Sequence, residues 1–223
     1  MRAYFSQLLG SSRQQKQLPF IFPLLISLCS GAIFSLALAP YYYWWIAILS
    51  PALLYAVLHG RSAKQGFALG WAYGFGLWFV GAFWLYTSIH VYGDTNAALS
   101  VLMIAVMALV MGLFTAVQTW LYRRFFPETP LTFAPLWIVF EWAKTWVFTG
   151  FPWLFAGYAF TERYLDHYAP LFGVFGVSFV VIILACALVE LLKRRIFWLI
   201  PAAILLVGAW GASKLQFVEP KKT

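Results

Sequence analysis

The chain has 223 residues, of which 63% are hydrophobic and 10% are charged, and its formal net charge at pH 7 is +8. A soluble domain of this size could not cover so many apolar side chains with polar surface, so the composition excludes a water-soluble globular protein and indicates an integral membrane protein. Basic residues between apolar segments usually set the orientation of a membrane protein. We therefore interpret the positive charge as a topology signal and expect no nucleic-acid partner.

Apolar runs long enough to cross a bilayer recur along the chain. A hydrocarbon core of roughly 30 Å requires about 20 apolar residues per helix. The sequence therefore predicts an all-α bundle of about seven transmembrane helices, at Leu18–Leu38, Tyr41–Leu58, Gln65–Tyr86, Ala97–Tyr122, Leu131–Phe148, Tyr168–Leu192 and Ile196–Gly211. We expect one polytopic membrane domain at residues 18–212, a cytoplasmic tail at 1–17 and a short periplasmic tail at 213–223.

The basic residues indicate how this bundle is oriented. With a cytoplasmic N-terminus, ten of the fifteen Lys and Arg residues lie on the cytoplasmic side: Arg2, Arg13, Lys16, Arg61, Lys64, Arg123, Arg124, Lys193, Arg194 and Arg195. Four lie on the opposite side: Arg163, Lys214, Lys221 and Lys222. Every short inner loop then carries at least two basic residues, as the positive-inside rule requires. We predict a multi-pass protein with its N-terminus inside and its C-terminus outside.

Candidates for metal binding and nucleophilic chemistry are weak in this sequence. His59 and His167 have no partners at ligand spacing, so we expect no metal ion and no cofactor. Cys29 and Cys186 fall inside predicted spans, where apolar surroundings suppress the reactive thiolate. We interpret both cysteines as packing residues.

Small and aromatic residues predict packing and interface positions. Gly66, Gly70 and Gly74 repeat at four-residue spacing along the third span, which lets another helix approach closely. Tyr41–Trp45, Trp84 and Tyr86 place amphipathic rings at the predicted outer interface. These rings either anchor the protein in the membrane or form a wall for a lipid that enters from the outer leaflet, and the sequence leaves both interpretations open.

Two charged residues interrupt the fifth predicted span. Glu141 and Lys144 are three residues apart and so share one helix face. Each charge costs about 3 kcal/mol at a helix centre, so both side chains should face protein or water. In one interpretation Lys144 reaches outward and Glu141 pairs with it for structural reasons. In the other, the pair binds a ligand.

The stretch "TGFPWLFAGY", at residues 149–158, breaks the apolar pattern directly after this pair. Gly150 and Pro152 stop the helix there. Irregular backbone at membrane depth is tolerated only where protein or a cavity satisfies its hydrogen bonds. We therefore predict that this stretch forms the rim of an outward-facing groove, and the candidate lipid-binding residues are Glu141, Lys144, Trp153, Tyr158, Trp84 and Tyr86.

Four strings carry a resemblance to a known family: "LALAPYYYWW", "FWLYTSIHVYG", "FEWAKTWVFTGFPWLFAGYAF" and "APLFGVFGVSF". In order and spacing they resemble the membrane domain of bacterial apolipoprotein N-acyltransferase, from about Leu18 to the C-terminus. The Thr-Gly-Phe-Pro-Trp element behind a Glu-x-x-basic pair is the most specific part. Lys144 stands where many members are expected to have arginine, which replaces a bidentate fork with a point charge.

The resemblance implies an acyl transfer on the outer side of the bacterial inner membrane. The family takes an acyl chain from a phospholipid, typically phosphatidylethanolamine, and places it on the α-amino group of a diacylglyceryl-cysteine at the start of a lipoprotein. A nitrilase-like domain with a Glu-Lys-Cys triad carries the chain as a thioester, which splits the transfer into two easier steps. The expected partners are therefore phospholipid and lipoprotein substrates.

We expect no nitrilase-like domain within these residues, because it would begin near residue 213, and neither cysteine matches the family's nucleophile. No catalytic residue is carried over, and the chain alone is predicted to be inactive. It would be a fragment, a truncated product or half of a split enzyme whose nitrilase-like domain is separately encoded. Two alternatives from other classes are a small lipid transporter or flippase and a noncatalytic membrane scaffold.

Overall fold

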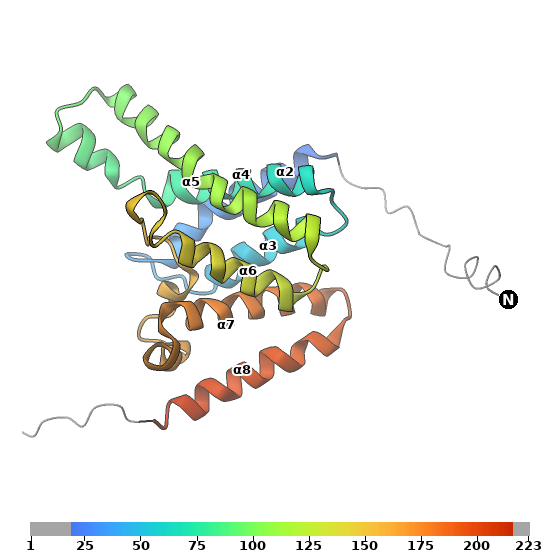
Figure 1. The fold of residues 1–223 in the computed structure, drawn as a ribbon. Coiled ribbons are helices and arrows are strands. Elements are labelled where there is room, and N and C mark those ends of the chain that lie inside the picture. Colours follow the sequence, from blue (N-terminus) through green and yellow to red (C-terminus); the bar gives the residue numbers. More distant parts are fainter. Residues whose placement is uncertain (1–18, 216–223) are drawn as a thin grey trace, which may run out of the picture.

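The computed structural model describes residues 19–215, which form an all-helical bundle without strands. One α-helix overlaps each predicted span (Figure 1). The helices are α2 (Ile21–Ile33), α3 (Ile46–Leu58), α4 (Ala63–Gly81), α5 (Ala97–Phe125), α6 (Pro130–Ala143), α7 (Ala169–Leu192) and α8 (Leu199–Ala212). The all-α prediction is confirmed, while the predicted tails at 1–17 and 216–223 lie outside the described residues.

Short turns lie at one end of the bundle and long connections at the other (Figure 1). At the short-turn end, the backbone N–H of Gly60 donates to Glu128, and His59 lies 3.4 Å from Glu190. These contacts bring the turns after α3, α5 and α7 together. At the opposite end, the long segment between α6 and α7 meets both other connections, because Trp44 packs on Phe160 and Trp84 packs on Trp153. We call these the basic end and the loop end.

Helices α4 and α5 pack closely because glycine lines their contact. A Cβ atom added at Gly74 would lie 2.7 Å from the Cα atom of Gly112, so the two backbones approach too closely for a side chain. At the next contact, the Thr119 hydroxyl donates to the carbonyl oxygen of Gly66 over 2.8 Å. The predicted packing role of the glycine ladder is therefore confirmed.

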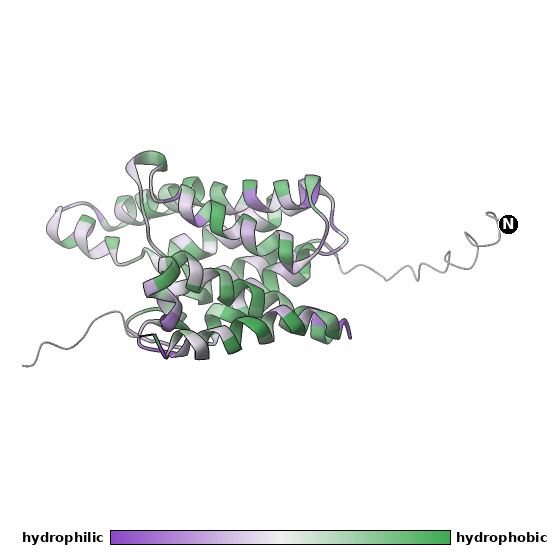
Figure 2. Ribbon diagram, turned by 60° about the horizontal axis from the view of Figure 1, so that its bottom comes forward, coloured by the Kyte–Doolittle hydropathy of each residue, from purple (hydrophilic) through white to green (hydrophobic). Residues whose placement is uncertain are grey.

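Hydrophobic residues run along the helices of the bundle (Figure 2), and many of their large side chains are exposed. Exposed side chains include Leu102 on α5 and Val207 on α8, with relative exposures of 57% and 66%. Two segments, Ala97–Phe125 and Tyr164–Leu192, are helical, long and apolar enough to cross a membrane. The apolar segments Ile21–Ala37, Ile46–Leu58 and Ile196–Ala212 are shorter.

Helix α2 ends at Ile33, although the first span was expected to reach Leu38. Two further predicted spans also end earlier than expected. The fifth was expected to reach Phe148, but α6 ends at Ala143 and Phe148 adopts a left-handed conformation with a φ of 55°. The third was expected at Gln65–Tyr86, but Ser62 caps α4 in a reciprocal capping box and Gly81 ends it. In both cases the apolar run of the sequence continues past the end of the helix. The apolar side chains beyond the helix lie in the connections of the loop end.

Candidate functional site

The segment that follows α6 leaves the helical conformation abruptly. Thr149, Gly150 and Leu154 have φ values of 71°, 87° and 59°, in the left-handed region. Gly150 is required there, since a Cβ atom would collide with the Thr145 carbonyl oxygen. The backbone N–H of Phe151 then donates to the carbonyl oxygen of Lys144 over 2.7 Å, which turns the chain back toward the bundle.

The Glu141 carboxylate holds this returning segment. It is only 2% exposed, and its Oε1 atom accepts hydrogen bonds from the Trp137 indole N–H and the Ala156 backbone N–H, each over 2.9 Å. One residue further on, the N–H of Gly157 donates to the Ser178 hydroxyl of α7 over 2.8 Å. The predicted break at residues 149–158 is therefore irregular backbone, and buried side chains of α6 and α7 accept from two of its N–H groups.

Lys144 does not pair with this carboxylate. Among the described residues no ion pair joins Glu141 and Lys144, and the Lys144 side chain turns inward rather than outward, with an exposure of 7%. Its ammonium lies 5.0 Å from the ring centre of Phe155 and 5.8 Å from that of Trp78. The cation is therefore held between aromatic faces. Neither the proposed structural ion pair nor the proposed outward reach of Lys144 occurs in the described part of the chain.

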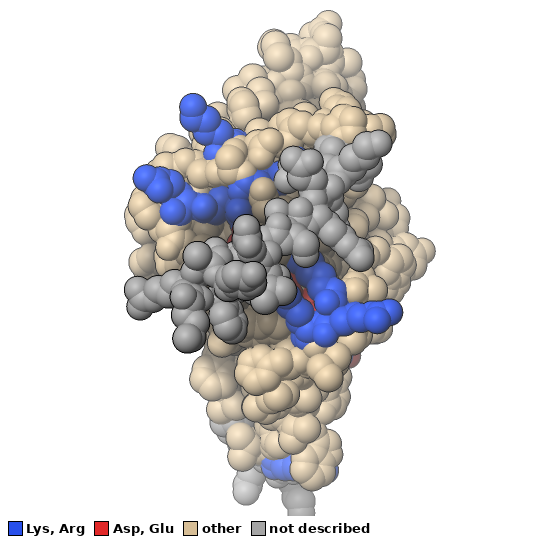
Figure 3. Space-filling model, turned by 90° about the vertical axis from the view of Figure 1, so that its right-hand side faces the viewer, with Lys and Arg blue, Asp and Glu red and all other residues tan. Residues whose placement is uncertain are grey.

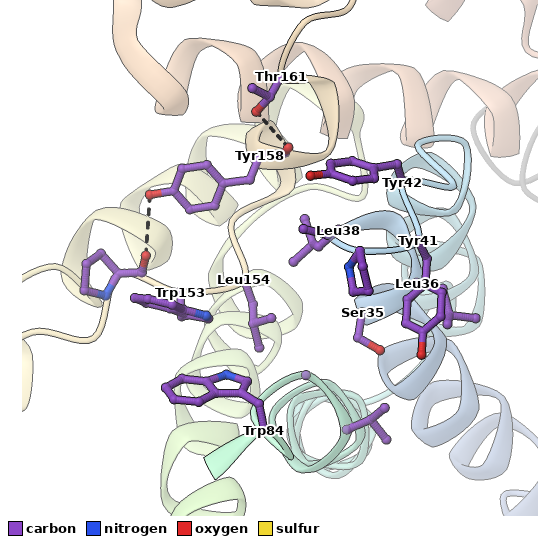
Figure 4. A pocket seen from close by; sticks show the side chains of 15 residues that line it. Ser35, Leu36, Leu38, Tyr41, Tyr42, Trp84, Trp153, Leu154, Tyr158 and Thr161 are labelled. Atoms are coloured by element: carbon purple, nitrogen blue, oxygen red, sulfur yellow. Dashed lines mark hydrogen bonds between the residues drawn. The ribbon is translucent and has the colours of Figure 1, made fainter. Parts of the chain in front are cut away.

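A pocket of about 690 Å³ opens at the loop end (Figure 4). Three segments that are distant in the sequence surround it: the chain after α2, the end of α4 and the irregular segment after α6. Its lining residues are Ser35, Leu36, Leu38, Ala39, Pro40, Tyr41, Tyr42, Val80, Gly81, Trp84, Pro152, Trp153, Leu154, Tyr158 and Thr161. The lining combines aliphatic side chains with Tyr and Trp rings, as in a site for an amphipathic molecule.

The aromatic rings on one side of this pocket form a continuous row of stacked and tilted rings. Phe151 lies on Trp78 with ring centres 5.0 Å apart, Trp153 lies 5.7 Å from Phe151, and Trp84 lies 5.8 Å from Trp153. Trp84 and Trp153 face the pocket beside Leu154 (Figure 4). The stack therefore connects the open pocket wall to the buried ring beside Lys144.

The structure divides the six predicted site residues into three groups. Trp84, Trp153 and Tyr158 line the pocket. Glu141 and Lys144 lie buried behind it, next to the backbone and rings that support its wall. Tyr86 lies outside the pocket, stacks on Phe83 and contacts the His90 ring at a tilt.

Sequence reasoning missed the contribution of the chain after α2. Residues 35–42 form an entire side of the pocket, although only Tyr41 and Tyr42 belonged to the aromatic group that the sequence placed at this interface. The available signal was the Pro40 that follows the first span and forces an extended turn there.

Taken together, the fold and the pocket define an all-α domain with an apolar outer surface and an aromatic-lined cavity at one end. The chain belongs to the apolipoprotein N-acyltransferase family, since residues 30–187 match the family model described as apolipoprotein N-acyltransferase N-terminal domain. This match includes the pocket, Glu141 and Lys144.

Curated relatives are named apolipoprotein N-acyltransferase. One from Azotobacter vinelandii is 40% identical over 195 residues, which cover 84% of this chain and 38% of the relative. Those from Pseudomonas putida and Vibrio vulnificus are 38% and 35% identical, covering 84% and 86% of this chain and 39% of each relative. The chain thus spans less than two fifths of the length of these relatives.

Proposed function

We propose that this chain is the membrane domain of an apolipoprotein N-acyltransferase and that its pocket binds the phospholipid donor and the diacylglyceryl lipoprotein during N-acylation. The observation that carries the proposal is the pocket at the loop end, whose wall combines apolar side chains with Trp and Tyr rings. Aliphatic side chains such as Leu38 and Leu154 suit an acyl chain, and amphipathic rings suit the boundary between acyl chain and head group.

We further propose that all seven helices cross the bacterial inner membrane, with the basic end in the cytoplasm. The basic end carries seven Lys and Arg side chains and two carboxylates in the described residues: Arg61, Lys64, Arg123, Arg124, Lys193, Arg194 and Arg195, with Glu128 and Glu190. Apart from the buried Glu141 and Lys144, the described part of the loop end carries two basic and three acidic side chains: Arg163, Lys214, Asp94, Glu162 and Asp166. This asymmetry supports an orientation in which the pocket opens toward the periplasm.

In this proposal the described residues bind and orient lipids, and a nitrilase-like domain performs the chemistry, whether continuous with this chain or separately encoded. Cys186 is completely buried, and Cys29 lies exposed on the apolar helix α2. A buried thiol cannot reach a substrate and apolar surroundings suppress the reactive thiolate, so we assign the thioester to neither cysteine. The 223-residue polypeptide, incubated with phosphatidylethanolamine, should therefore gain no acyl adduct in its intact mass, and an adduct on either cysteine would contradict this assignment.

Photo-cross-linking tests the pocket assignment directly. The chain in nanodiscs would be irradiated with phosphatidylethanolamine that carries a diazirine on its acyl chain. We expect cross-linked peptides from residues 35–42, 80–84 and 152–161. The double variant Trp84→Ala/Trp153→Ala should lower this labelling several-fold. Its matched control is Trp142→Ala/Trp146→Ala, which removes another packed pair of exposed tryptophans outside the pocket.

The same experiment separates the proposal from the other two classes. A scaffold without a lipid site would give no labelling above that of exposed surface positions, and the two double variants would behave alike. A lipid transporter would be labelled in the pocket but would also move fluorescent phospholipid between the leaflets of a vesicle. Pocket labelling without lipid movement supports the acyltransferase membrane domain.

A further inference from the structure

The turn between α7 and α8, at the basic end, gathers three consecutive cations on the surface. Lys193, Arg194 and Arg195 are all exposed, and they lie at the end of the bundle opposite the pocket. Figure 3 views this end of the molecule and shows its Lys and Arg side chains in separate groups rather than evenly spread.

A buried carboxylate orients two of these cations. Glu190 is fully buried, and its oxygens lie 3.6 Å from the Lys193 ammonium and 3.4 Å from the Arg195 guanidinium. The Tyr55 hydroxyl also donates to Glu190 over 3.0 Å, which fixes the carboxylate between α3 and α7. A single carboxylate therefore contacts two basic side chains of this turn, and the side chain of Arg194 forms no ion pair with any described residue.

Apolar side chains flank this cationic turn on both sides. Leu192 precedes it with an exposure of 78%, and Ile196 and Phe197 follow it with exposures of 68% and 67%. A cluster of cations between exposed apolar side chains matches the boundary of a bilayer, where the cations meet phosphate groups and the apolar side chains meet acyl chains. A soluble polyanion would leave these apolar side chains in water.

We propose that the α7–α8 turn is a binding site for the phosphodiester head group of an anionic phospholipid, such as phosphatidylglycerol, in the inner leaflet. Lys193, Arg194 and Arg195 contact the head group, Glu190 positions Lys193 and Arg195 from below, and Leu192 and Phe197 contact the acyl chains. This site is separate from the pocket at the loop end. It requires the basic end to lie at a membrane surface, but it does not require lipid binding in the pocket.

Titration of the detergent-purified chain with phosphatidylglycerol, followed by native mass spectrometry, tests the site. The double variant Arg194→Gln/Arg195→Gln should weaken phosphatidylglycerol binding by roughly 10- to 50-fold. Each basic residue near an anionic membrane surface changes the affinity by about five-fold, and the variant removes two of them. The control Lys64→Gln/Arg124→Gln removes two exposed charges from the same end, on α4 and α5, and should change binding much less. The single variant Arg194→Gln leaves the Glu190 contacts intact, so it reports on binding even if the double variant folds poorly.

Three results would overturn the proposal. Equal weakening by both double variants would show diffuse attraction to the basic end rather than a site. Equal binding of phosphatidylcholine and phosphatidylglycerol would show that the head-group charge is not recognised. Complete competition by millimolar inorganic phosphate would identify a free-anion site instead of a lipid site.

Discussion

The Glu141 carboxylate on α6 accepts a hydrogen bond from the backbone N–H of Ala156, fifteen residues further along the chain, over 2.9 Å. The same oxygen also accepts from the Trp137 indole. One buried acceptor thus ties the helix to the segment that returns from the loop end and carries Trp153 and Tyr158 to the pocket. A charge that costs free energy inside an apolar bundle is retained here because irregular backbone needs an acceptor.

We predict that Glu141→Leu lowers the free energy of unfolding by about 3 kcal/mol. The substitution leaves two buried N–H donors without an acceptor, and each such donor costs about 1–3 kcal/mol. Glu141→Gln keeps an acceptor oxygen at the same position and should lose less. Thermal unfolding in detergent micelles measures both changes, and equal stability of Glu141→Leu and the wild type would show that the hydrogen bonds do not hold the segment.

Exchanging the two charges, Glu141→Lys with Lys144→Glu, distinguishes this arrangement from an internal ion pair. An ion pair tolerates the exchange because opposite charges remain side by side. A lysine at position 141 has no acceptor for the Ala156 N–H. We therefore expect the exchanged protein to unfold as readily as Glu141→Leu, and full retention of stability would contradict the assignment.

The close approach of α4 and α5 predicts a strong difference between two glycines. Gly74→Ala should destabilise the protein by about 1–3 kcal/mol, because the new methyl group meets the backbone of Gly112 and neither helix can move without repacking. Gly211→Ala on α8 is the control, since no atom lies within 4 Å of a Cβ atom there. Unfolding midpoints of the two variants in one detergent provide the comparison, and similar midpoints would refute tight packing at Gly74.

The proposed orientation predicts opposite thiol accessibility at the two ends. In a background without Cys29 and Cys186, a membrane-impermeant maleimide added to intact spheroplasts should label Tyr92→Cys. The Tyr92 side chain is 84% exposed at the loop end. Arg194→Cys at the basic end should be labelled only after the membrane is permeabilised. Labelling of Arg194→Cys in intact spheroplasts would reverse the orientation, and labelling of both sites would reject the number of spans.

The His59 side chain predicts a pH-dependent stability at the basic end. Burial and the nearby Lys193 ammonium hold the pKa of His59 below its ordinary value of 6.5. The unfolded chain therefore takes up a proton more readily than the folded protein, so stability is lost as the pH falls below 6.5 and is unaffected above it. The loss is at most about 1.4 kcal/mol per pH unit.

Unfolding midpoints at pH 7.5 and pH 5.5 check this prediction. The difference between the two midpoints should be smaller in His59→Gln than in the wild type. Lys64→Gln is the control, because it changes an exposed charge at the same end without contacting Glu190. An unchanged difference in His59→Gln would show that other groups cause the pH dependence.

The sequence by itself determined the all-helical class, the order of the seven described helices and the presence of an irregular stretch after the fifth predicted span. The length and composition of an apolar run can be read from consecutive residues, and they suffice to predict a helix. The break at Gly150 and Pro152 is also a local signal, because these residue types interrupt a helix wherever they occur. The motif around Glu141 and Trp153 also sufficed to indicate the family, which the match over residues 30–187 then established.

Only the tertiary structure decided which residues meet. The spacing of Glu141 and Lys144 suggested an ion pair. In the structure the backbone N–H of Ala156 donates to the Glu141 carboxylate, and aromatic rings lie beside the Lys144 ammonium. The pocket joins residues 35–42 to residues 152–161, and Glu190 gathers Tyr55 from α3 and Lys193 from the next turn. The helical repeat predicts which side chains share one face of a helix. Which residues contact that face depends on how the helices pack against each other.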